Sequence, residues 1–136
     1  MGTTLMALTG FIAWSLALLV LMELIRTKMV ASKQIQANGF QPDNGNLSPF
    51  MQRLARAHAN CVEGLPIFGG LMLVAVLANK TSVTDSLAYV LLGARIIQSV
   101  IHLISTSAVA VSMRFTAFAV QMTIAIYWCI QLLTTK

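Results

Sequence analysis

Charge is scarce in this chain. Only 10% of its 136 residues are Asp, Glu, Lys or Arg, whereas soluble domains carry about 25%. Acidic residues are the scarcest, with four against nine basic ones. Hydrophobic residues make up 57% of the chain, and the mean hydropathy is +0.79. This composition excludes an ordinary soluble domain.

Cysteine is nearly absent. Cys61 and Cys129 form neither a CxxC pair nor a metal-ligand pattern, so no metal site is predicted. We expect both to be unpaired, small, buried side chains.

The apolar residues gather in four long windows. A transmembrane helix needs roughly 20 mainly apolar residues, so the windows predict an all-α, integral membrane four-helix bundle with four transmembrane spans. Residues 1–136 should form this single domain. The windows are Met1 to Met22, Gly64 to Asn79, Ser86 to Met113 interrupted only by Arg95, and Phe115 to Thr135.

Turn and cap residues set the expected helix ends. The first helix should run from about Leu5 past Arg26, before a loop rich in turn formers at 37–46. Ser48-Pro49 is typical of an N-cap followed by a first-turn proline, so the second helix should run from there to about Ala78. The third, capped by Thr84 or Ser82, should reach about Ile104, and the fourth should start between Ala108 and Ser112.

The basic residues are unevenly placed. Five flank the first connection and Arg114 lies near the third, whereas the opposite side offers only Lys80 and Lys136. By the positive-inside rule the first and third loops should face the cytoplasm, with both termini on the other side. The net charge of +5 therefore suits anionic lipid headgroups or an anionic ligand. No nucleic-acid motif is present. The five residues are Arg26, Lys28, Lys33, Arg53 and Arg56.

Two of the expected helices carry a polar stripe. At about 100° per residue, Arg53, Arg56, Asn60 and Glu63 fall within an arc of about 80°. On the third helix, Arg95, Gln98 and His102 share a face through their i, i+3, i+7 spacing. Polar groups at membrane depth are costly and usually face a bundle interior or a water-filled site.

The stripes allow two interpretations. Glu63 and Arg95 can form a structural ion pair that sets the register of the two helices. That pairing leaves the other arginines without a partner, and a surplus of cations beside one acid indicates a binding site for an anion.

The stretch Arg-x-x-Arg-Ala-His-x-Asn-Cys-x-Glu-x-x-Pro, from Arg53 to Pro66, resembles the signature of the membrane-associated proteins in eicosanoid and glutathione metabolism (MAPEG). Length, four-span layout and the arginine near the start of the fourth helix agree with that family. The resemblance implies a homotrimer that binds glutathione between adjacent subunits near the cytoplasmic leaflet.

The resemblance also implies roles for individual residues. Arg114 matches the arginine that activates the glutathione thiol, and is the expected catalytic residue. Arg95 matches the arginine that pairs with the motif glutamate. The implied glutathione-binding residues are Arg26, whose match is weaker, together with Arg53, Arg56, Asn60, Glu63, Gln98 and His102.

The implied function is a membrane glutathione transferase, with glutathione as cosubstrate and a lipophilic electrophile as second substrate. A glutathione-dependent peroxidase activity fits the same residues. The alternative is a non-catalytic lipid- or partner-binding membrane protein of the same fold.

Ala59 and Phe118 depart from the pattern of some members, so the motif favours thiol binding over any particular eicosanoid reaction. For His102, a hydrogen bond to the thiolate and a purely structural bond to a neighbouring helix remain open.

Overall fold

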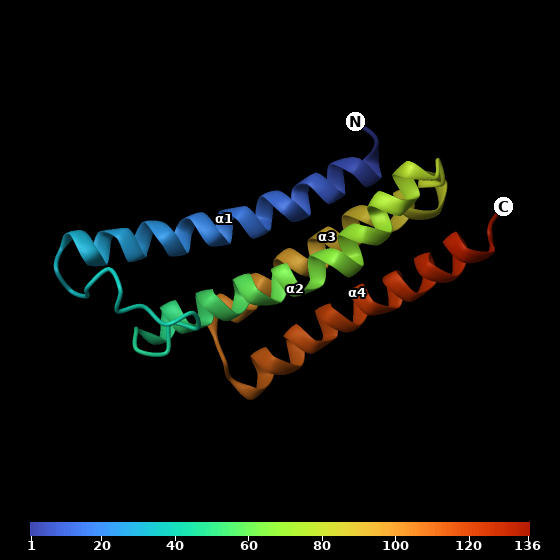
Figure 1. Cartoon of the computed structure of the whole chain (residues 1–136). Coiled ribbons are helices and arrows are strands. Elements are labelled where there is room, and N and C mark those ends of the chain that lie inside the picture. The colour runs from blue at the N-terminus through green and yellow to red at the C-terminus, as the bar shows by residue number, and fades with distance from the viewer.

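The chain folds into four long helices joined by one long and two short connections. In the computed structural model, which describes all 136 residues, these are α1 (Thr3–Ala31), α2 (Pro49–Leu77), α3 (Thr81–Ile104) and α4 (Ala108–Thr134). The helices run up and down, so both termini lie at one end and the connections 32–48 and 105–107 at the other (Figure 1). Each helix is long and apolar enough to cross a membrane. The expected all-α bundle with four spans is confirmed.

The expected starts of α2 and α4 are confirmed. Ser48 caps α2 by accepting from the Met51 amide, with Pro49 in the first turn. Ser107 caps α4 in the same way. The expected cap of α3 is wrong, because that helix already begins at Thr81. The Thr84 hydroxyl instead bonds the Thr4 hydroxyl at 2.6 Å and ties α3 to the start of α1.

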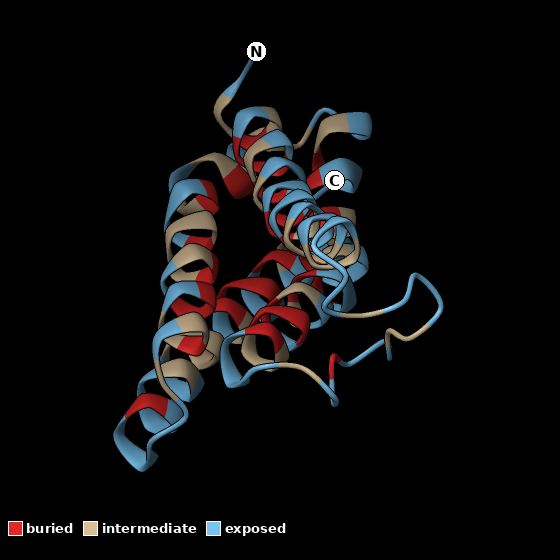
Figure 2. Cartoon of the chain, turned by 90° about the vertical axis from the view of Figure 1, so that its left-hand side faces the viewer, coloured by how far each residue is buried: buried red, intermediate tan, exposed pale blue.

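The apolar core is divided into two clusters. The one nearer the termini draws on all four helices and contains Phe11, Phe68 and Trp128. The buried residues of the one nearer the long connection come from α1 and α2, around Leu18, Met22 and Leu54, and Leu103 of α3 packs against them. Buried faces of the helices turn toward one another, while exposed residues cover the outside and the long connection (Figure 2). At the connection end, α3 therefore contributes no large apolar cluster, and its buried residues there are polar.

The helices do not pack equally. α1 packs on α2 and α3, while α4 packs along α3, meets α2 at few positions and does not contact α1.

Both cysteines are unpaired as expected, but the expectation that both are buried is wrong for Cys129, which is exposed on α4.

Candidate functional site

The polar stripes of α2 and α3 face each other at the connection end of the bundle. Arg53 Nε donates to the Leu103 carbonyl at 2.9 Å. About two turns further along α2, Asn60 Nδ2 and His102 Nδ1 lie 3.3 Å apart. These contacts fix the register of the two helices through polar groups.

Arg95 is the most deeply buried charged side chain, with 1% of its surface exposed. Its guanidinium carbon lies 5.5 to 6.0 Å from the ring centroids of Phe11, Phe68 and Phe118, a geometry that favours cation–π attraction. Nη1 donates to the Asn60 carbonyl at 3.4 Å. Nε and Nη2 are buried without a hydrogen-bond partner. The aromatic rings thus surround a guanidinium of which only Nη1 donates a hydrogen bond.

The expected ion pair between Glu63 and Arg95 is not formed. The one salt bridge of the chain joins Arg26 and Glu23, and Glu63 makes no side-chain hydrogen bond. The physical reason is geometric: Arg95 turns inward among the three rings, whereas Glu63 lies on the exposed side of α2. The register role assigned to this pair falls instead to the α2–α3 hydrogen bonds.

A cavity of about 260 Å³ opens beside Arg95. It brings together four of the expected site residues and adds Gly64, Ile67, Phe68 and Phe118, which sequence reasoning did not assign to it. The residues lining it are Asn60, Glu63, Gly64, Ile67, Phe68, Arg95, Gln98 and Phe118.

Gly64 and Gln121 are the residues that sequence reasoning missed. A Cβ at Gly64 would lie 2.8 Å from Arg95 Nη2, so only glycine lets the guanidinium approach α2 this closely. Gln121, fully buried, donates to Gln98 Oε1 at 2.9 Å. The sequence could have indicated Gln121, because it lies seven residues after Arg114 and therefore on the same helix face.

Three further arginines surround His102. Arg53, Arg56 and Arg114 all lie within electrostatic range of its ring, and no carboxylate neutralises any of them. The Arg114 Nε is buried without a hydrogen-bond partner. Arg53 and Arg56 also line a second hollow of about 220 Å³ at the start of α2, together with Pro49, Gln52 and Thr106. The predicted site residues of α2, α3 and α4 are therefore brought together.

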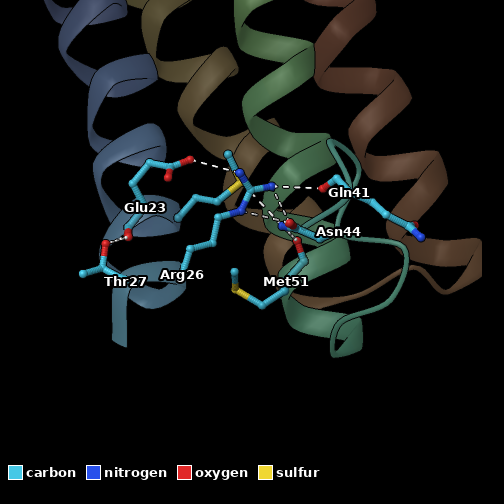
Figure 3. A network of polar contacts seen from close by, with 7 residues as sticks. Glu23, Arg26, Thr27, Gln41, Asn44 and Met51 are labelled. Atoms are coloured by element: carbon cyan, nitrogen blue, oxygen red, sulfur yellow. Dashed lines mark hydrogen bonds and ion pairs between the residues drawn. The ribbon is translucent and has the colours of Figure 1, made fainter. Parts of the chain in front are cut away.

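Arg26 is the exception among the expected site residues. Its Nε donates to Asn44 Oδ1 at 3.1 Å and its Nη1 to Glu23 at 3.1 Å, and its Nη2 reaches the Gln41 carbonyl (Figure 3). Its guanidinium also lies 5.2 Å from the Phe40 ring centroid. Within one chain, Arg26 anchors the long connection and lies outside the α2–α3–α4 site.

The arrangement suits a polyanionic ligand with one positive group. Four arginines contribute planar donor forks that match carboxylates, and a single acid, Glu63, lines the cavity beside them. Unused buried donors on Arg95 and Arg114 would gain most from a ligand, since an unpaired buried polar group is costly.

Comparison with known families agrees with this geometry. The model of the MAPEG family matches residues 4–134, nearly the whole chain. No curated protein and no solved structure matches significantly. Family members generally use glutathione and act in membrane glutathione-transferase or eicosanoid-type metabolism, and the four apolar helices fit a multi-pass membrane protein in contact with lipid. The chain therefore belongs to the MAPEG family.

Proposed function

We propose that the protein is a membrane glutathione transferase that activates the glutathione thiol with an arginine. The observation that carries the proposal is that Arg53 and Arg56 line one hollow at the start of α2 and Arg114 has a buried, unpartnered Nε, while no carboxylate forms a salt bridge with any of the three. An anionic ligand would gain charge-assisted hydrogen bonds from these guanidinium groups. Glutathione brings two carboxylates to meet them.

The residues fit the groups of glutathione one by one. Arg53 and Arg56, which line the hollow at the start of α2, would bind the carboxylates bidentately. Glu63 is free to accept from the ligand ammonium, because it pairs with no arginine of the chain. Asn60 and Gln98 supply amide groups from the walls of the cavity.

Arg114 would stabilise the thiolate. A free thiol with a pKa of about 8.5 is mostly protonated at neutral pH, and a neighbouring guanidinium favours the ionised form. The buried, unpartnered Nε of Arg114 is a donor available for that purpose. His102 is held by Asn60 and would direct its other ring nitrogen at the same sulfur. The ionised sulfur would then attack a lipophilic electrophile, or break the O–O bond of a lipophilic hydroperoxide to give an alcohol and a sulfenic acid, which a second glutathione would convert to the disulfide and water.

A homotrimer explains the place of Arg26. Because α1 does not contact α4 and Arg26 lies near the outer end of α1, this side chain would instead reach glutathione bound to a neighbouring subunit. The expected position of the site between subunits accounts for that separation.

Calorimetric titration of glutathione into the detergent-solubilised protein tests the proposal. We expect binding to the wild type, a loss of at least about tenfold in affinity for Arg56→Ala, since one charged hydrogen bond contributes about 1.5–3 kcal/mol, and no loss for Lys28→Ala. Lys28 is an exposed cation near the end of α1 and is the matched control. Absence of binding to the wild type, or equal loss in both variants, would contradict the proposal.

A further inference from the structure

Two buried glutamines from different helices meet at the wall of the cavity beside Arg95. Gln98 on α3 is 8% exposed and Gln121 on α4 is fully buried, and Gln121 Nε2 donates to Gln98 Oε1 at 2.9 Å. Polar side chains within membrane spans are costly and usually mark a functional site. Gln98 lines the cavity whereas Gln121 does not, so binding of a ligand in the cavity leaves the presence of Gln121 unexplained.

The backbone of α4 fixes the direction of the Gln121 amide. The oxygen and nitrogen of such an amide are told apart by their hydrogen-bond partners. Gln121 Nε2 also donates to the Ala117 carbonyl at 3.1 Å, and a carbonyl can only accept. Turning the amide over would lose this bond and place Oε1 against the carbonyl oxygen. Both hydrogens of Nε2 are therefore committed, and the Gln121 oxygen is left buried without a partner.

The direction of the Gln121 amide in turn fixes that of Gln98. Because Gln121 presents a donor, Gln98 presents its oxygen to it, and the NH2 group of Gln98 is left for the cavity. The bond that Gln98 accepts from Gln121 is the one hydrogen bond of its side chain, and an amide NH2 group only donates. The α3 wall of the cavity thus offers a donor, while Glu63 on α2 offers an acceptor to the same space.

We propose that Gln121 is a positioning residue, which holds the Gln98 amide with its NH2 group toward the cavity and so selects an acceptor group of the ligand at that wall. A carboxylate or a thiolate meets this requirement, whereas an ammonium group is directed to Glu63. The identity of the ligand as glutathione rests on the proposed function, but the direction of the two amides does not.

A double-mutant cycle on glutathione affinity tests whether Gln121 acts through Gln98. Methionine has the length of glutamine without its hydrogen-bonding groups, so Gln121→Met fills the same space and frees the Gln98 amide to turn. Calorimetric affinity of the detergent-solubilised protein should fall roughly three- to tenfold, the usual worth of one hydrogen bond. In a Gln98→Met background the same change should cause no further loss.

Gln131→Met is the matched control for this cycle. Gln131 lies on the same helix nearer its C-terminal end and is half-buried, and this variant should bind glutathione as the wild type does. A merely structural role of Gln121 would give the same loss in both backgrounds. That result, or an unchanged affinity of Gln121→Met, would overturn the proposal.

Exchange of the side-chain amides with water tests their direction without a ligand. Nuclear magnetic resonance of the protein with isotope-labelled glutamine resolves the NH2 groups, and loss of a signal in each Met variant assigns it. The Gln121 NH2 group should exchange slowly because both its hydrogens are bonded, and the Gln98 NH2 group should exchange faster and shift when glutathione is added.

A Gln98 NH2 group that is protected in the free protein would overturn the proposal, and this outcome can be read in the wild type even if Gln121→Met fails to fold. If the wild type binds no glutathione, the transferase proposal fails, while the exchange rates still decide the direction of the two amides.

Discussion

At the scale of single residues, Arg95 is the most deeply buried charge of the bundle. Its guanidinium is buried among three aromatic rings and no acid neutralises it. Cation–π attraction in a desolvated setting is worth about 2 kcal/mol or more, which offsets part of the cost of a buried charge. Gly64 completes this environment, because it allows Arg95 Nη2 and the Phe68 ring to lie against the backbone of α2.

Gly64→Ala should therefore destabilise the protein although alanine is the better helix former. The added Cβ would lie 2.8 Å from Arg95 Nη2 and 3.1 Å from the Phe68 ring, and such overpacking costs about 1–3 kcal/mol. The measurement is thermal unfolding in detergent. Gly70→Ala is the control: with open space around its Cβ, it should leave stability unchanged or raise it by up to about 1 kcal/mol. Equal stability of the two variants would mean that Arg95 is not confined as described.

At the scale of elements, the connection 32–48 is anchored from both sides. Asn44 is fully buried; its Oδ1 accepts from Arg26 on α1, and its Nδ2 donates to the Met51 carbonyl on α2 at 2.7 Å (Figure 3). Its φ of 56° lies in the left-handed region, where asparagine is tolerated better than most residues. A single side chain thus joins the end of α1 to the start of α2.

Asn44→Gly should loosen this connection without melting the helices. Glycine accepts the positive φ, so the variant isolates the loss of the side-chain bonds, worth about 1–3 kcal/mol for bonds to a charged group. Hydrogen exchange by mass spectrometry should become roughly tenfold faster over residues 36–47, while the helix interiors keep their protection. Asn38→Gly, at an exposed loop position, should leave the exchange of 39–47 unaltered. Unchanged exchange in Asn44→Gly would show that the anchor does not hold the connection.

At the scale of the whole molecule, long apolar windows predicted four spans because membrane thickness fixes helix length. Helical periodicity likewise predicted which polar residues of α2 and α3 share a face. The direction of a side chain could not be predicted in this way. Opposite charge favoured a pair between Glu63 and Arg95, but three aromatic rings from three helices compete for the same guanidinium. Contacts of that kind depend on packing between distant segments, which periodicity within one helix does not encode.

Assembly is the property of the whole molecule that the proposed site requires. Because Arg26 lies outside the cavity of its own chain, we expect a homotrimer with a mass three times the 14.7 kDa of one chain. Native mass spectrometry in a mild detergent measures it, with a denaturing detergent as the control that yields the single chain. A monomer or dimer under mild conditions would contradict a site shared between three subunits.

The central claim is that the Arg114 guanidinium stabilises the thiolate of bound glutathione. Thiolate absorbance near the ultraviolet edge measures that ionisation directly. Adding glutathione to the wild type should produce the absorbance with a midpoint one to two pH units below the free thiol value of about 8.5, equivalent to about 1.4–2.7 kcal/mol of thiolate stabilisation. Because the bound thiol has the lowered pKa, the signal should persist at neutral pH and fade as the pH drops. Arg114→Ala should abolish it at neutral pH while the assembly stays intact. A thiolate signal that is absent from the wild type at saturating glutathione, or equally strong in Arg114→Ala, would contradict the account.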